Sequence, residues 1–115
     1  NIESKVKYSM NREKIPDIKI NVKVNGMIKD YPEWLDLEKK SHVQIVEKQI
    51  EDTIENEGEA LIHQLQEKNV DSLGIGSFIR SKRKNWSNAD YKKDYPKMKM
   101  KVDVNVSIVQ SGIGE

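Results

Sequence analysis

The chain has 115 residues, of which 34% are charged and 36% hydrophobic, and its formal net charge at neutral pH is +1. This length suits one domain with one core, no run approaches the roughly 18–20 apolar residues of a membrane-spanning helix, and the lack of cysteine excludes disulfides, thiol nucleophiles and cysteine-ligated zinc. Because the chain begins at Asn1 rather than Met, we expect an excised or processed part of a longer protein.

Charge is segregated along the sequence. Residues 1–32 carry a net charge of +3, residues 33–68 carry −6 and residues 69–115 carry +4. An acidic middle segment between two basic segments predicts faces of opposite sign, although most such charges in proteins are solvated.

Two strands are predicted before residue 30. Val6, Tyr8 and Met10 alternate with polar residues, as in a half-buried strand. Residues 11–16 predict a turn, because Pro16 has no N–H to donate to a sheet. The next strand has a strict alternation, and one of its faces carries Ile18, Ile20, Val22, Val24 and Ile28.

A long helix is predicted from Leu37 to Lys68. Its N-cap is either in the run Asp30–Glu33 or at Asp36, and Asn69 suits the left-handed position after its end. Its apolar stripe comprises Val43, Val46, Ile50, Ile54, Leu61 and Leu65.

That helix needs tertiary support, because like-charged glutamates at i,i+4 spacing and an internal Gly58 weaken it. The apolar faces of the strands are the candidate surface. We therefore predict that Ile50, Ile54, Leu61 and Leu65 are buried against Ile20, Val22, Val102, Val104 and Val106.

Two short helical segments are expected after the long helix. Asp71 is the predicted N-cap of the first, with its carboxylate accepting the N–H of Leu73 or Gly74. Gly74 and Gly76 predict close approach to a neighbouring element, and Arg80 is expected to pair with a carboxylate such as Glu55 or Glu59. The second segment begins at Ser87, which has capping-box-like spacing to Asp90, and stops before Pro96.

The last strand alternates most clearly, with Met98, Met100, Val102, Val104, Val106 and Ile108 on one face. One wet face is typical of an antiparallel sheet with helices on a single side. The predicted fold class is α+β: a small antiparallel sheet of three to four strands, with one long helix and one or two shorter helices packed on one face, in the order β-β-α-α-β. Residues 1–115 form a single domain in this prediction.

The order of these motifs carries a family resemblance. The run from Asp71 through Gly74 and Gly76 to Arg80 is followed by Trp86, Tyr95-Pro96 and the alternating strand to Gly112, and is preceded by a strand with Gly26 and the long acidic helix. This order resembles the C-terminal domain of GerAC-type lipoproteins, the C subunits of the nutrient germinant receptors of bacterial spores. The resemblance covers nearly the whole chain.

The resemblance implies a non-enzymatic subunit at the outer face of the inner spore membrane. It would be tethered by a lipid on an upstream cysteine and would act beside the integral-membrane A and B subunits of the receptor. In this interpretation the chain is the C-terminal domain of a longer lipoprotein, and the anchor lies upstream of Asn1.

None of the candidate cofactor or metal sites in the sequence has a strong signal. Gly74-Ile75-Gly76 lacks both the third glycine and the leading strand of a dinucleotide loop. On a continuous helix His42 and His63 lie about 30 Å apart, too far to share a metal ion. The carboxylates Glu51, Asp52, Glu55 and Glu59 have no loop to wrap calcium, so an acidic surface is the simpler interpretation. No cofactor or metal is expected.

The basic stretch Arg80, Lys82, Arg83, Lys84 and Trp86 is a candidate surface for a partner or for anions, although a solvated loop would have the same composition. Lysines 97, 99 and 101 either widen this patch or guard a strand edge. The alternative function is nucleic-acid binding through a basic strand face. The sequence pI of about 8.1 argues against it, and no nucleic-acid partner is expected.

Overall fold

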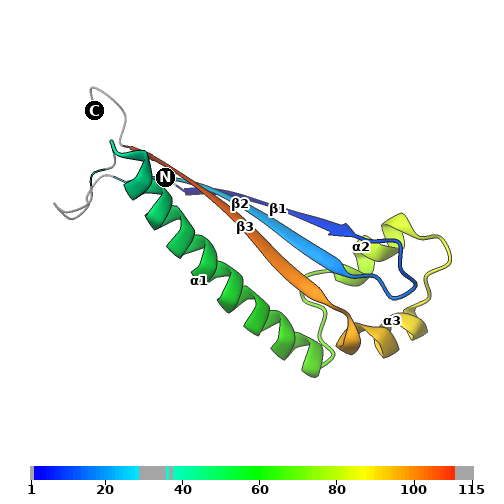
Figure 1. Ribbon diagram of the computed structural model, residues 1–115. Coiled ribbons are helices and arrows are strands. Elements are labelled where there is room, and N and C mark those ends of the chain that lie inside the picture. The colour runs from blue at the N-terminus through cyan, green and yellow to red at the C-terminus, as the bar shows by residue number, and fades with distance from the viewer. Residues whose placement is uncertain (1, 29–35, 37, 111–115) are drawn as a thin grey trace.

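The computed structural model describes residues 2–28, 36 and 38–110 (Figure 1). The strands are β1 (Ile2–Met10), β2 (Ile18–Ile28) and β3 (Met100–Gln110). Between β2 and β3 in sequence come α1 (Lys40–Glu67), α2 (Ile75–Lys82), α3 (Asn88–Asp94) and the 3₁₀ turn η1 (Tyr95–Lys97). In Figure 1, α1 runs alongside β3, whereas α2 and α3 gather at one end of the sheet. The predicted α+β class, with one long and two shorter helices, is confirmed.

The three described strands form one sheet in the order β1-β2-β3. β1 and β2 are antiparallel, with Tyr8 opposite Ile20, as predicted. β2 and β3 are parallel, with Ile20 opposite Val102, so the prediction of a wholly antiparallel sheet was wrong. A parallel sheet is apolar on both faces only when crossover helices cover both. Here the helices between β2 and β3 pack on one face, and the opposite face keeps its polar residues.

The core lies on the face that carries the even-numbered strand residues. Ile75 and Ile79 of α2 are completely buried there, beside Tyr95 of η1 and Ile18 of β2. Further along the sheet Val102, Val104 and Val106 of β3 are buried beneath α1. The packed end of the molecule is therefore where α2, α3 and η1 meet the sheet.

The predicted phase of α1 is wrong in its second half. Leu61 is 54% exposed, whereas the next residue, Ile62, is buried, and so is Gln66. The contact row follows steps of four through Gly58, where an added Cβ would lie 3.4 Å from Val102 Cγ2. Gly58, which only weakens an isolated helix, marks here the close approach of α1 to β3. Ile50 and Ile54 lie on the predicted side and are half-buried.

The start of α1 also differs from the prediction. The N-cap residue is Lys39, whose side chain makes no capping hydrogen bond. The alternative start in residues 30–33 lies outside the described residues. Asp36 is not the N-cap: its carboxylate accepts the Glu38 N–H at 3.0 Å, and its own N–H donates to His42 Nδ1 at 2.8 Å.

The end of α1 is as predicted. Asn69 has φ 54°, the left-handed conformation. Its N–H donates to the Gln66 carbonyl at 3.0 Å, and the Val70 N–H donates to the Leu65 carbonyl at 2.8 Å. This pair of bonds is the Schellman motif, which satisfies carbonyls that a helix end leaves free.

The two short helices differ in how well the sequence located their starts. Ser87 caps α3 as predicted, because its hydroxyl accepts the Asp90 N–H at 3.1 Å. α2, however, begins only at Ile75, with Gly74 as its N-cap residue. The sequence predicted this start at Asp71. The Asp71 carboxylate does accept N–H groups of α2, but it does so from the loop before the helix.

Candidate interaction surfaces

Asp71 is the centre of the loop that leads into α2. Its two carboxylate oxygens accept the N–H groups of Ile75 and Gly76, each at 2.8 Å. These are later N–H groups than the predicted ones of Leu73 and Gly74. A carboxylate at this end of a helix also meets the positive end of the helix dipole. Asp71 therefore holds α2 in place, and both of its oxygens are engaged.

Three tyrosines surround this loop. The Tyr8 hydroxyl donates to the Leu73 carbonyl at 2.8 Å, and the Tyr95 hydroxyl donates to the Val70 carbonyl at 2.7 Å. Burial, followed by the negative charge of Asp71, raises the pKa of Tyr8, Tyr91 and Tyr95 above the usual value for tyrosine. The hydroxyls therefore stay neutral, and two of them tie the loop to β1 and η1.

The two glycines at the start of α2 have different roles. Gly74 has φ 72°, which favours glycine, and open space surrounds the position of a Cβ. At Gly76 an added Cβ would lie 2.8 Å from Tyr91 Cε2, closer than carbon atoms pack. The close approach expected at both positions is thus found at Gly76 only, where α2 meets α3.

Arg80 bonds within its own neighbourhood. Its Nη1 donates to Asn88 Oδ1 at 2.7 Å, and its Nη2 donates to Ser77 Oγ at 3.2 Å. The expected pairing with Glu55 or Glu59 was wrong, because those carboxylates bond to β3 instead.

The basic stretch at the end of α2 and just after it contains two kinds of residue. Arg83 donates to the backbone carbonyls of Lys14 at 3.1 Å and Asn11 at 2.9 Å, and lies 5.9 Å from the Trp86 ring centroid. Arg83 thus fastens this stretch to the β1–β2 turn. Lys82 and Lys84, in contrast, are exposed. Arg83 also lines a hollow of about 470 Å³, together with Lys14, Ile15, Asn85, Trp86, Asp90, Lys93 and Asp94.

A ladder of glutamates joins α1 to the outer edge of β3. Four carboxylates at i,i+4 spacing each accept a backbone N–H from every second residue of the strand. The pairs are Glu59 with Val102 at 3.1 Å, Glu55 with Val104 at 3.0 Å, Glu51 with Val106 at 2.9 Å and Glu47 with Ile108 at 2.9 Å. Four helical residues rise about 6 Å and two strand residues about 6.6 Å, so the two repeats nearly match.

Sequence reasoning missed this ladder. The i,i+4 spacing of the glutamates was its visible signal, but we interpreted it as repulsion on a solvated face. The ladder also accounts for the suggested calcium cluster, because Glu51, Glu55 and Glu59 bond to β3 while Asp52 pairs with Lys48 at 2.9 Å on the exposed side.

The two histidines do not share a site. His63 Nε2 lies 3.0 Å from Glu67 Oε1 on the exposed side of α1, whereas His42 binds the Asp36 N–H. Among the described residues, three or more metal-ligating side chains nowhere gather into a cluster that suits a metal ion. Over the same residues, none of the helices combines the length and apolarity needed to cross a bilayer.

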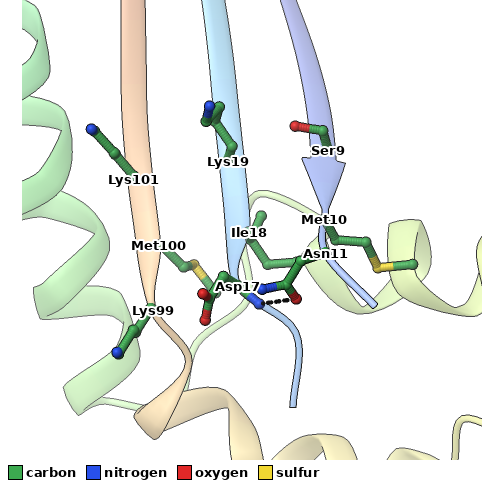
Figure 2. Close-up of a pocket in the computed structure, with 9 residues that line it drawn as sticks. All are labelled: Ser9, Met10, Asn11, Asp17, Ile18, Lys19, Lys99, Met100 and Lys101. Atoms are coloured by element: carbon green, nitrogen blue, oxygen red, sulfur yellow. Dashed lines mark hydrogen bonds between the residues drawn. The ribbon is translucent and has the colours of Figure 1, made fainter. Parts of the chain in front are cut away.

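Lysines collect on the outer face of the sheet. Lys5 of β1 lies directly opposite Lys23 of β2, and Lys19 of β2 lies opposite Lys101 of β3. Figure 2 shows Lys19, Lys101 and Lys99 beside a hollow of about 550 Å³, which is also lined by Ser9, Met10, Asn11, Asp17, Ile18 and Met100. Like charges directly opposite each other on neighbouring strands lower the stability of a sheet.

Comparison with known proteins identifies the family. Residues 1–112 match the family described as spore germination B3/GerAC like, C-terminal. The chain belongs to this family. It is 24% identical over 116 residues to the spore germination protein GerQC of Bacillus cereus, covering 100% of this chain and 32% of that protein.

A solved relative shares the fold. The crystal structure of the GerBC protein superposes with a TM-score of 0.76 at 21% identity, covering 93% of this chain and 35% of that one. The chain therefore spans about a third of the length of both relatives. The family expected from the order of motifs is confirmed, and these comparisons give no support to nucleic-acid binding.

Proposed function

We propose that this chain is the C-terminal domain of the C subunit of a spore nutrient germinant receptor, and that it acts there as a non-enzymatic interaction domain. The observation that carries the proposal is the match of residues 1–112 to one germination family, together with the fold shared with GerBC. The 24% identity to the germination protein GerQC, which extends over the whole of this chain, supports the same role.

The proposed setting follows from the family resemblance. The longer protein would be held at the outer face of the inner spore membrane by a lipid on an upstream cysteine. Its partners would be the integral-membrane A and B subunits of the receptor. In this setting the domain needs surfaces that bind other proteins.

The use of the polar side chains supports binding over catalysis. Asp71, Arg80 and Arg83 form hydrogen bonds with neighbouring segments of the fold, and so do the ladder glutamates. Lys82 and Lys84 are exposed, and in sequence they flank Arg83, which lines the hollow at Trp86. We propose these two lysines as contacts to a receptor partner, with Arg83 and Trp86 holding the loop after α2 in shape.

A chimera tests the role directly. The last third of GerQC would be replaced by this chain in spores that lack their own GerQC, and nutrient-triggered germination would be followed by the fall in optical density. We expect the chimera to restore germination and to co-purify with the A and B subunits. A stable chimera that does neither, in a strain where intact GerQC does both, would contradict the proposed role.

Charge reversal tests the proposed contacts. Lys82→Glu with Lys84→Glu should reduce co-purification while leaving the melting temperature of the domain unchanged, because both side chains are exposed. Lys39→Glu with Lys40→Glu is the matched control, since it changes the charge equally at the far end of α1. Equal effects of the two pairs would show that only net charge matters.

A further inference from the structure

The two outer edges of the sheet differ in whether their backbone groups have hydrogen-bond partners. Along β3, alternate backbone N–H groups are bound by the glutamate ladder of α1. At the other edge, β1 pairs with β2 on one side, and no described strand pairs with its outer side. An open edge offers unpaired N–H and C=O groups at every second residue and is a template for another strand. The open edge is therefore the one able to accept a partner.

Only part of β1 is accessible on the helix side. Tyr8 packs edge-on against Phe78 of α2 at a centroid distance of 5.6 Å and bonds to Leu73, so α2 covers this end of the strand. Before Tyr8, the same face carries two exposed apolar residues, Ile2 at 79% and Val6 at 55%, with Ser4 between them. Residues 2–7 thus combine an open edge with apolar side chains that remain in water.

The opposite face of the same segment carries Glu3, Lys5 and Lys7, so it is basic at Lys5 and Lys7 and acidic at Glu3. Lys5 lies opposite Lys23, and both line a hollow of about 310 Å³ with Lys7 and Asn21. In the described part of the chain, no carboxylate lies within ion-pair distance of these three lysines. Like charges directly opposite each other cost stability, and an added anionic side chain would relieve that cost.

We propose that residues 2–7 of β1 bind an extended acidic and apolar segment of a partner protein, which adds to the sheet as a fourth strand. Alternate apolar side chains of this segment would cover Ile2 and Val6, and the intervening Asp or Glu side chains would reach Lys5 and Lys7. The segment would span about 20 Å, the length of six strand residues.

The charges on β1 disfavour a second copy of this chain as the occupant. On the polar face a second β1 would present one glutamate, Glu3, against two lysines, Lys5 and Lys7, and so would add net positive charge to a face that is already basic. This inference concerns the domain itself and holds whether or not the domain serves a germinant receptor.

Peptide binding to the 115-residue chain tests the proposal. The probe is a fluorescent seven-residue peptide of alternating valine and glutamate, and its anisotropy is titrated with protein. We expect saturable binding that weakens with added salt, and slower hydrogen exchange of the β1 amides on binding. A peptide with the same composition but clustered glutamates should bind much more weakly, because its side chains cannot sort onto two faces.

Substitutions in β1 test whether the peptide binds at this edge. Lys5→Glu and Lys7→Glu should each weaken binding by up to about fivefold. Val6→Lys should weaken it through the apolar face, and it is tolerated by the fold because Val6 is already exposed. The control Lys92→Glu with Lys93→Glu, an exposed pair on α3, should leave the affinity unchanged at moderate salt.

Three results would overturn the proposal. The first is the absence of binding by the alternating peptide, or equal binding by the clustered one. The second is protection of amides outside β1 while β1 amides exchange freely. The third is a dimer in sedimentation whose β1 amides are protected without peptide, since the edge would then serve a second copy.

Discussion

Glu55 of α1 accepts a hydrogen bond at 3.0 Å from the backbone N–H of Val104 in β3. With the three other bonds of the glutamate ladder, this bond joins α1 to the edge of the sheet. The four bonds use backbone N–H groups that another strand could otherwise pair with. The ladder therefore fixes the rotation of α1 about its axis and closes this edge against further pairing.

Glu55→Ala should lower the free energy of unfolding by about 1–3 kcal/mol, because it leaves a partly buried N–H without its charged acceptor. Urea denaturation measures this change, and hydrogen exchange should show faster exchange at Val104 than in the parent chain. Glu57→Ala is the matched control, since Glu57 lies exposed on the same helix. Equal losses from both variants would mean that helix propensity, not the ladder, sets the effect.

The helical glycines Gly58 and Gly76 should respond to alanine in opposite ways. At Gly58 the new Cβ would lie in ordinary contact with Val102, so Gly58→Ala should be neutral or stabilise by up to about 1 kcal/mol through helix propensity. At Gly76 the Cβ would lie 2.8 Å from Tyr91, so Gly76→Ala should destabilise by about 1–3 kcal/mol, and Gly76→Leu by more. Melting temperatures of the variants suffice, and a harmless Gly76→Leu would show that α2 does not pack closely on α3.

Ile62 and Leu61 test the phase of α1. Ile62→Ala should cost about 2–5 kcal/mol because its side chain is buried, whereas Leu61→Ala should cost less than about 1 kcal/mol. Ile54 is half-buried, so its truncation should fall between them. The denaturation midpoints give the order directly. A larger loss of stability from Leu61→Ala than from Ile62→Ala would support the buried face of α1 that the sequence predicted.

Alkaline pH should unfold the domain through its tyrosines. The pKa values of Tyr8, Tyr91 and Tyr95 are raised in the folded state, so the folded chain keeps protons that the unfolded chain loses above about pH 10. Stability is therefore unaffected by these groups below that pH and falls as the pH rises beyond it. Tyrosinate absorbance followed together with circular dichroism checks this: ionisation of these three hydroxyls should coincide with loss of structure, and ionisation within an intact fold would contradict it.

Local patterns in the sequence were enough to locate most elements. Alternation over β2 and β3 predicted both strands, and the end of α1 followed from Asn69, because a left-handed residue after a helix is a local property. The cap at Ser87 is local in the same way.

Relations between distant segments could not be predicted in this way. Whether β2 and β3 run parallel depends on the path of the connection, not on their alternation. The choice between Leu61 and Ile62 depends on how α1 lies against β3, since neighbouring residues on a helix point about 100° apart.

The candidate surface illustrates the same limit. Arg80, Lys82, Arg83 and Lys84 are alike in a sequence, but their surroundings separate them. Arg80 and Arg83 meet acceptors in α3 and the β1–β2 turn, whereas Lys82 and Lys84 extend into solvent. The lysine pairs across the sheet, such as Lys5 with Lys23, become visible only when the register is known.

The parallel pairing of β2 with β3 has a consequence during synthesis. Ile20 lies beside Val102, so the ribosome must add 82 residues after Ile20 before this contact can form. At about 5–20 residues per second, that is a delay of roughly 4 to 16 s. A β1–β2 hairpin that forms before β3 arrives has an unpaired edge and uncovered apolar residues, the kind of surface through which incomplete chains aggregate.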